Sequence, residues 1–268
     1  MKGKLFIVSG PSGSGKSTMG HCINGLAPYF YKGNITGKLE IYGKQLNEIF
    51  EHSKYVGTVL QDSDAQFVGL SVAEDIAFVL ENDEVETEIM KNKVREIAEF
   101  VKIEKLLDLK PHDLSGGQKQ KVSLAGIMVD DTKIFLYDEP LANLDPLSGK
   151  YAIELIEELH EKGEITTIII EHRLEDVLHR KVDRIIVVDK GRIVADGTPD
   201  NILKGNILTE MNIREPLYIS ALKYSNVDLE KYQDISDVEK IDFPEVKENI
   251  LKWIEHNQVE EQKKDSEI

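Results

Sequence analysis

The chain has 268 residues, 41% of them hydrophobic, and a formal net charge of −16. This size and composition exclude a disordered or fibrous chain and allow one large domain or two small ones. The negative charge disfavours binding to nucleic acid and to anionic lipid headgroups. No apolar run approaches the roughly 20 residues that span a bilayer, so we expect any membrane contact to go through another protein. The single cysteine, Cys22, cannot form an internal disulfide and is typical of a reducing compartment.

Short apolar segments alternate with helical segments up to about Pro199, which predicts an α/β fold with a mostly parallel core sheet. The expected strands are 5–9, 54–60, 133–137, 166–170 and 184–188, with a hairpin turn at 189–192. The expected helical segments begin at about Lys16 and include a mostly helical insertion at 72–109, then 149–159 and 174–178. Between Gly33 and Gly43 the alternating pattern predicts an exposed antiparallel strand or hairpin arm.

The pattern weakens beyond Pro199, where the chain becomes acidic and irregular. One amphipathic helix is predicted from Val246, Ile250, Leu251 and Ile254, and the polar end from Asn257 is expected to be disordered. We therefore expect two parts, a domain at 1–199 and an acidic C-terminal extension at 200–268.

A glycine-rich loop lies between the first predicted strand and the first predicted helix. It has the spacing of a P-loop, in which glycines turn backbone N–H groups toward phosphate oxygens and the lysine adds a positive charge. A flexible Gly/Ser turn is the alternative, but it leaves Lys16 and the preceding strand unexplained. The predicted ATP-binding residues of this loop are Gly10, Pro11, Ser12, Gly13, Ser14, Gly15, Lys16, Ser17 and Thr18, with Ser17 also a ligand of Mg²⁺.

Two carboxylates, Asp138 and Glu139, end the apolar strand predicted at 133–137. Such a strand end is costly unless it faces a cation or a reacting group, although a solvated acidic loop is the alternative. In a P-loop protein we expect Asp138 to hold the Mg²⁺ shell and Glu139 to orient and deprotonate the water that attacks the γ-phosphate.

The segment Leu114-Ser115-Gly116-Gly117-Gln118 distinguishes this chain from most P-loop proteins. Ser115 and Gln118 have the spacing of a capping box, and the two glycines between them expose the N-terminal amides of a helix. The chain here resembles the ABC ATPase family. The resemblance implies that Ser115, Gly116, Gly117 and Gln118 contact ATP held by the P-loop of a second ATPase subunit, so that a homo- or heterodimer is needed for a complete site.

Further short segments follow in the order found in that family. Gln61 resembles the glutamine that approaches Mg²⁺ and the γ-phosphate, and Asp145 resembles the aspartate that reaches across the dimer. His172 resembles the histidine that hydrogen-bonds the γ-phosphate. The resemblance thus implies a catalytic set of Glu139, His172 and Gln61, a metal set of Ser17, Gln61 and Asp138, and a helical subdomain at about 72–128.

A narrower resemblance is to the ATPases of energy-coupling factor importers for vitamins and metal ions. The segments that carry it are 24–26, 61–78, 171–177 and 213–217. It implies an ATPase that hydrolyses ATP with Mg²⁺ at the cytoplasmic face of the membrane and drives integral membrane subunits. A truncated or regulatory subunit with little hydrolysis, or a non-transport ABC ATPase, is the alternative.

One feature departs from the family pattern. ABC ATPases normally carry antiparallel strands, with an aromatic residue that stacks on adenine, before the strand that leads into the P-loop. This chain begins almost at that strand. Three explanations remain: the true start lies upstream, the segment comes from another chain, or this protomer binds nucleotide mainly through phosphates. For the chain as given we expect a reduced antiparallel subdomain and weak discrimination between ATP and GTP.

Overall fold

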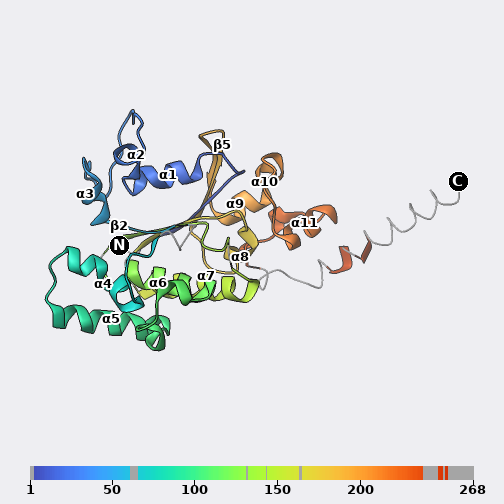
Figure 1. The fold of residues 1–268 in the computed structure, drawn as a ribbon. Coiled ribbons are helices and arrows are strands. Elements are labelled where there is room, and N and C mark those ends of the chain that lie inside the picture. Colours follow the sequence, from blue (N-terminus) through green and yellow to red (C-terminus); the bar gives the residue numbers. More distant parts are fainter. Residues whose placement is uncertain are drawn as a thin grey trace, which may run out of the picture.

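A six-stranded sheet forms the centre of the computed structural model, in the order β2-β3-β4-β1-β5-β6 (Figure 1). The structure describes residues 3–60, 66–130, 132–142, 144–162, 165–237, 247–249 and 251–252. The strands are β1 Leu5–Ser9, β2 Val56–Val59, β3 Ile134–Asp138, β4 Thr166–Ile170, β5 Arg184–Asp189 and β6 Arg192–Gly197. The first five pair in parallel, whereas β6 pairs antiparallel with β5. The predicted α/β class with a mostly parallel core sheet is confirmed.

Helices cover both faces of the sheet (Figure 1). The face that carries α1 (Lys16–Ile23) is opposite the face that carries α6 (Gly116–Met128) and α7 (Pro146–Lys162). Neighbouring strand residues point to opposite faces, and both Ile7 and Val8 are buried, as expected for a sheet covered on both sides. Gly20 of α1 lets this helix approach the sheet closely, since a Cβ there would lie 3.0 Å from Cδ1 of Ile170.

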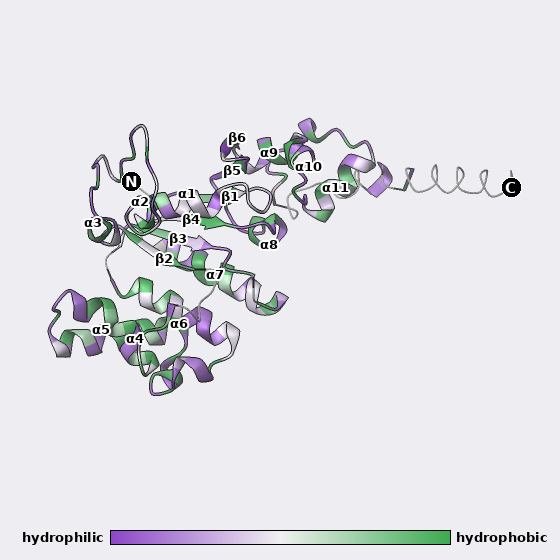
Figure 2. Ribbon diagram, turned by 45° about the horizontal axis from the view of Figure 1, so that its top comes forward, coloured by the Kyte–Doolittle hydropathy of each residue, from purple (hydrophilic) through white to green (hydrophobic). Residues whose placement is uncertain are grey.

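A group of helices projects from one end of the sheet (Figure 2). It contains α4 (Val72–Asn82), α5 (Thr87–Val101), η2 (Glu104–Leu106), η3 (Pro111–Asp113) and the start of α6. The spacing of Val72, Ile76 and Leu80 places these buried side chains on one face of α4. The mostly helical insertion predicted from the sequence is therefore present.

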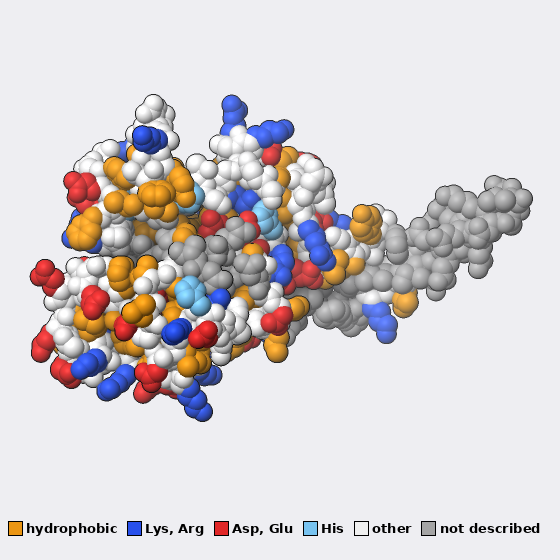
Figure 3. Space-filling model, viewed as in Figure 1, with side chains coloured by type: hydrophobic (Ala, Val, Ile, Leu, Met, Phe, Trp, Pro, Cys, Tyr) orange, Lys and Arg blue, Asp and Glu red, His pale blue; other side chains and the backbone are white. Residues whose placement is uncertain are grey.

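The segment between Gly33 and Gly43 is not a strand, which corrects the sequence prediction. It is irregular apart from one isolated bridge between Ile41 and Lys44. A strand needs a hydrogen-bonded neighbour, and within the described part of the chain no strand pairs with this segment. Hydrophobic side chains gather on the surface here, around α2 (Leu26–Tyr29) and α3 (Ile49–Ser53), as Figure 3 shows. Exposed ones include Phe30, Ile35 and Phe50.

The predicted turn between β5 and β6 is present. Lys190 and Gly191 both have positive φ, at 46° and 73°, which is the backbone of a two-residue type I′ hairpin turn. The short helix α8 (Leu174–Leu178) lies between β4 and β5 in the chain.

The C-terminal part forms small helices beside the sheet (Figure 1). These are α9 (Pro199–Lys204), α10 (Ile207–Glu210), α11 (Leu217–Tyr224) and η4 (Leu229–Lys231). Residues 247–249 and 251–252 are helical, within the predicted amphipathic helix, whereas Val246, Ile250, Ile254 and the end from Asn257 lie outside the described residues. Within the described residues, no helix combines the length and hydropathy that a bilayer span requires.

Candidate nucleotide-binding site

The carboxyl ends of three adjacent parallel strands bring the candidate residues together. In the sheet, β4 lies between β3 and β1. The P-loop follows β1, Asp138 and Glu139 lie at the end of β3, and His172 follows β4. Because parallel strands end at the same edge of a sheet, segments distant in the sequence meet there, which is where open α/β folds bind ligands.

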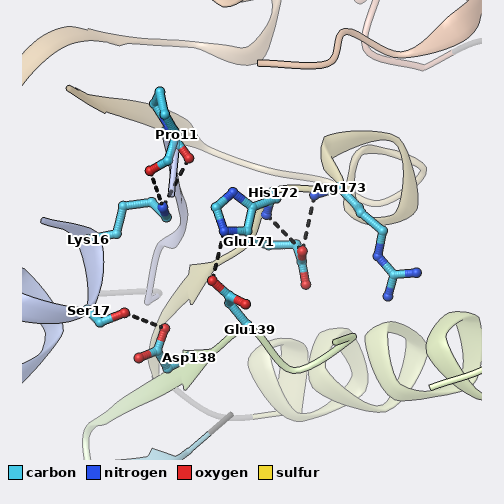
Figure 4. A network of polar contacts seen from close by, with 9 residues as sticks. Pro11, Lys16, Ser17, Asp138, Glu139, Glu171, His172 and Arg173 are labelled. Atoms are coloured by element: carbon cyan, nitrogen blue, oxygen red, sulfur yellow. Dashed lines mark hydrogen bonds and ion pairs between the residues drawn. The ribbon is translucent and has the colours of Figure 1, made fainter. Parts of the chain in front are cut away.

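The P-loop holds its lysine in a defined position. Lys16 Nζ donates hydrogen bonds to the backbone oxygens of Gly10 and Pro11, at 3.0 and 2.9 Å (Figure 4). Burial lowers the pKa of Lys16, while the nearby carboxylates of Glu139, Asp138 and Glu171 oppose that shift. A buried cation surrounded by the loop is suited to bind phosphate oxygens.

Two glycines of the loop adopt backbone conformations that other residues rarely take. Gly13 has φ of +75° and Gly15 has φ of +105°. The loop is also supported by the β5–β6 turn, because Gly191 N donates to Ser14 O at 2.8 Å. The hydroxyl oxygen of Ser14 is buried without a hydrogen-bond partner among the described residues, so an oxygen-rich ligand such as phosphate would satisfy it.

Asp138, at the end of β3, and Ser17, next to Lys16 on α1, form an oxygen-rich pair. Ser17 Oγ donates to Asp138 Oδ1 at 3.3 Å. Burial raises the pKa of Asp138, and the neighbouring Glu139 acts in the same direction, whereas the hydrogen bond from Ser17 lowers it. A hydroxyl and a carboxylate are hard oxygen ligands, so these residues fit Mg²⁺ by the chemistry of the donor set.

Glu139 and His172 are in direct contact. His172 Nε2 lies 2.7 Å from Glu139 Oε1, and the two side chains point toward one another (Figure 4). The backbone of Glu139 is left-handed, with φ of +50°, and its N–H donates to Ile170 O at 2.9 Å. A left-handed conformation at a non-glycine residue costs about 1–3 kcal/mol and is concentrated at functional sites.

Glu171 is a site residue that the analysis of the sequence did not assign. It is 3% exposed, and its Oε1 accepts hydrogen bonds from the backbone N–H groups of His172 at 2.7 Å and Arg173 at 3.1 Å. Arg173 in turn donates to the backbone oxygen of Leu141. Glu171 thus orients the segment that carries His172. The sequence feature that could have identified Glu171 is its position as a carboxylate directly after the apolar strand 166–170.

The glycine-rich segment at 115–118 has the predicted capping box. Ser115 N donates to Gln118 Oε1 at 2.9 Å and Gln118 N donates to Ser115 Oγ at 3.4 Å. Beside it, a cavity of about 570 Å³ opens between α6 and α7. Among the described residues, no hydrogen bond joins 115–118 to the P-loop. This cavity is lined by Ser115, Gly117 and Gln118, whereas Gly10, Pro11 and Ser12 of the P-loop line a different one.

Three predicted site residues remain: Asp145, Thr18 and Gln61. Asp145 accepts hydrogen bonds from Leu147 N, Ser148 N and Ser148 Oγ, at 3.0, 3.1 and 2.5 Å, and so caps the start of α7. The hydrogen bond from the Ser148 side chain holds the pKa of Asp145 below its usual range. Thr18 is exposed on α1. Gln61 lies outside the described residues.

Taken together, the parallel sheet, the P-loop and the two carboxylates define a P-loop nucleotide-binding protein. Comparison with known families refines this class. A family model described as ABC transporter matches residues 1–142, and a second model, described as ATP-binding cassette cobalt transporter, matches residues 205–268. The chain belongs to the ABC transporter family, whose members bind ATP.

Individual relatives agree with this assignment. The chain is 53% identical over 254 residues to an ABC transporter ATP-binding protein of Clostridium perfringens, covering 94% of this chain and 45% of the relative. It is 52% identical over 256 residues to one of Vibrio parahaemolyticus, covering 95% and 44%. The chain therefore spans less than half the length of these relatives.

A solved structure has the same fold. It is cbiO1 from Clostridium perfringens, part of the ABC transporter complex cbiONQ. The TM-score is 0.69 at 28% sequence identity, with 83% of this chain and 88% of that chain covered.

Proposed function

We propose that this chain binds and hydrolyses ATP as the motor of a membrane transporter. The observation that carries the proposal is the contact between Glu139 and His172 at the edge of the sheet where Lys16 and Asp138 also lie. A phosphate-binding cation, an oxygen-rich metal site and an oriented carboxylate are the parts that phosphoryl transfer to water needs.

The residues divide the work as follows. Lys16 and the backbone amides of the P-loop bind the phosphates, and Lys16 exchanges its bonds to Gly10 and Pro11 for bonds to phosphate oxygens. Glu139 accepts a proton from the attacking water, while His172 holds the Glu139 carboxylate in place. Ser17, Asp138 and Gln61 would hold Mg²⁺, which when bound neutralises charge on the phosphate oxygens.

We propose further that the complete site needs a second ATPase unit. The segment 115–118 begins a helix, and in the part of the chain that the structure describes no hydrogen bond joins it to the P-loop. The N-terminal amides of a helix bind anions, so this segment would contact phosphate held by another unit. Asp145 would lie at the same interface.

Mixing two inactive variants tests this arrangement in the full-length protein. Lys16→Ala removes the phosphate-binding cation, and Gly117→Asp places a negative charge at the helix terminus. Each alone should turn over little ATP. A mixture should recover part of the parental turnover, because one of the mixed sites combines an intact P-loop with an intact segment 115–118. As a control, two separately prepared parental samples are mixed in the same way and should stay active. If they do, a mixture of the variants that is as inactive as its components would contradict the shared site.

The family match at 205–268 and the likeness to cbiO1 support an importer of the energy-coupling factor type. In this proposal, integral membrane subunits dock on the ATPase at the cytoplasmic face of the membrane and carry a metal ion or vitamin. Co-expression with candidate integral membrane subunits, followed by uptake of radiolabelled cobalt ions into cells, tests the partner and the cargo together. ATP turnover that does not respond to these subunits would oppose the proposal.

A further inference from the structure

The C-terminal part of the chain reaches the nucleotide site. A cleft of about 630 Å³ is lined by Gly10, Pro11 and Ser12 of the P-loop and by His172. It is also lined by residues 212–215, which join α10 to α11. A segment far from the P-loop in the sequence therefore lies on the same cleft as the residues that surround Lys16.

The segment is anchored on both sides of Arg214. On one side, Ile213 is 6% exposed and its N–H donates to Leu208 O at 2.7 Å. On the other side, the Glu215 carboxylate is buried and lies 2.5 Å from Lys223 Nζ. The backbone of Arg214 is thus held by its neighbours, while its side chain stays exposed.

Three of the other charged side chains that line the cleft, those of Arg173, Asp176 and Glu215, already have ionic partners. Arg173 is engaged by the Leu141 backbone oxygen and by Asp176, which lies 3.3 Å away. Glu215 is engaged by Lys223, and Glu175 also lines the cleft. Within the described ranges, Arg214 has neither a hydrogen bond nor an ion pair. It is a cation held at the cleft without an anion.

We propose that Arg214 binds the terminal phosphate of ATP held by the P-loop, and that the C-terminal segment thereby distinguishes ATP from ADP. The inference rests on the proposed function, because the phosphate must first be bound at Lys16. Lys16 contacts the backbone of Gly10 and Pro11, which line the cleft. A triphosphate bound at Lys16 would therefore lie next to the cleft. A guanidinium can donate two parallel hydrogen bonds to a phosphate.

The test compares ATP with ADP, which lacks the terminal phosphate. Arg214→Ala and Arg214→Lys are prepared in the full-length protein, with Arg95→Ala on α5 as the matched control, since Arg95 is also exposed. Dissociation constants are measured with a non-hydrolysable ATP analogue and with ADP. Arg214→Ala should weaken analogue binding roughly 10- to 100-fold, as expected for a hydrogen bond to a charged group, and leave ADP binding unchanged. Arg214→Lys should fall between, and Arg95→Ala should match the parent.

Equal affinities of parent and Arg214→Ala for the analogue would overturn the inference, as would equal losses for both nucleotides. Arg214→Ala could instead keep its affinity for the analogue and lose the dimer formation that the analogue induces. That result would place Arg214 against the second unit and would also overturn the inference. Thermal melting of each variant without nucleotide checks that the fold is kept, and Arg214→Gln replaces the alanine variant if it is not. A parent protein that binds neither nucleotide would overturn the proposed function itself, a different result from any of these.

Discussion

His172 Nε2 lies 2.7 Å from Glu139 Oε1, although the two residues are 33 positions apart in the chain. The contact exists because β3 and β4 are parallel neighbours, with Asp138 paired to Ile170, so that the residues following each strand meet. Glu171, one residue earlier, holds the backbone of His172. Glu139 therefore has an orientation imposed from the adjacent strand.

Replacing Glu139 by glutamine should separate binding from turnover. The amide can still form the hydrogen bond with His172, but it cannot accept a proton from water. ATP turnover should fall by about 10²-fold or more, which is about 3 kcal/mol of barrier, with ATP affinity kept. Turnover is measured by phosphate release and affinity by calorimetry, with Glu96→Gln on α5 as the control. Parental turnover in Glu139→Gln would mean that another group is the base.

Replacing Lys16 by alanine should weaken ATP binding as well as turnover. The ammonium faces phosphate in the ground state and in the transition state, so its loss acts on both. Hydrogen bonds to charged groups contribute about 1.5–3 kcal/mol, which predicts a loss of affinity of roughly 10- to 100-fold. Lys91→Ala, at an exposed position on α5, serves as the control. Unchanged affinity by calorimetry would remove Lys16 from the site.

Replacing Asp138 by asparagine should raise stability while abolishing activity. Burial raises the pKa of Asp138 above the ordinary value of an aspartate. The Asp138 carboxyl therefore binds its proton more tightly in the folded protein than in the unfolded chain. Stability is lost as the pH rises from the pKa of the unfolded chain through the higher pKa of the folded protein. Asparagine avoids the loss, so the melting temperature at neutral pH should exceed that of the parent, and the difference should narrow on acidification.

The measurement is thermal melting without nucleotide or metal, at neutral pH and in steps toward pH 4. Asp108→Asn, an exposed carboxylate, is the matched control and should show no comparable gain. A lower melting temperature for Asp138→Asn at neutral pH would contradict the stated origin of the shift.

Glu215 and Lys223 should stabilise the C-terminal segment only when both are present. Their side chains are 3% and 20% exposed, and removing one partner leaves the other charge poorly solvated, at a cost of about 3–5 kcal/mol. Glu215→Leu and Lys223→Met should each lower the free energy of unfolding, and the double variant should recover much of the loss. Chemical denaturation of all four proteins gives the coupling energy. Additive losses would show that the pair is not coupled.

Much of the fold and site could be predicted because the relevant signals are contiguous. The core strands and the hairpin turn were expected close to their observed positions, since apolar β-branched runs and turn residues act locally. The expected strand between Gly33 and Gly43 was wrong, because alternation gives a segment the character of a strand but cannot supply its partner. Glu171 was missed because its role depends on backbone groups positioned after β4.

By itself, the amino-acid sequence determined the P-loop, the capping box at Ser115 and the two carboxylates at the end of β3. Each depends on the conformation of a few successive residues, so spacing and residue type suffice. Only the tertiary structure decided that β4 lies between β3 and β1, which brings His172 to Glu139, and that Arg214 lies on the cleft beside the P-loop. These contacts join segments that are distant in sequence, and they depend on strand order and helix packing, which no local spacing contains.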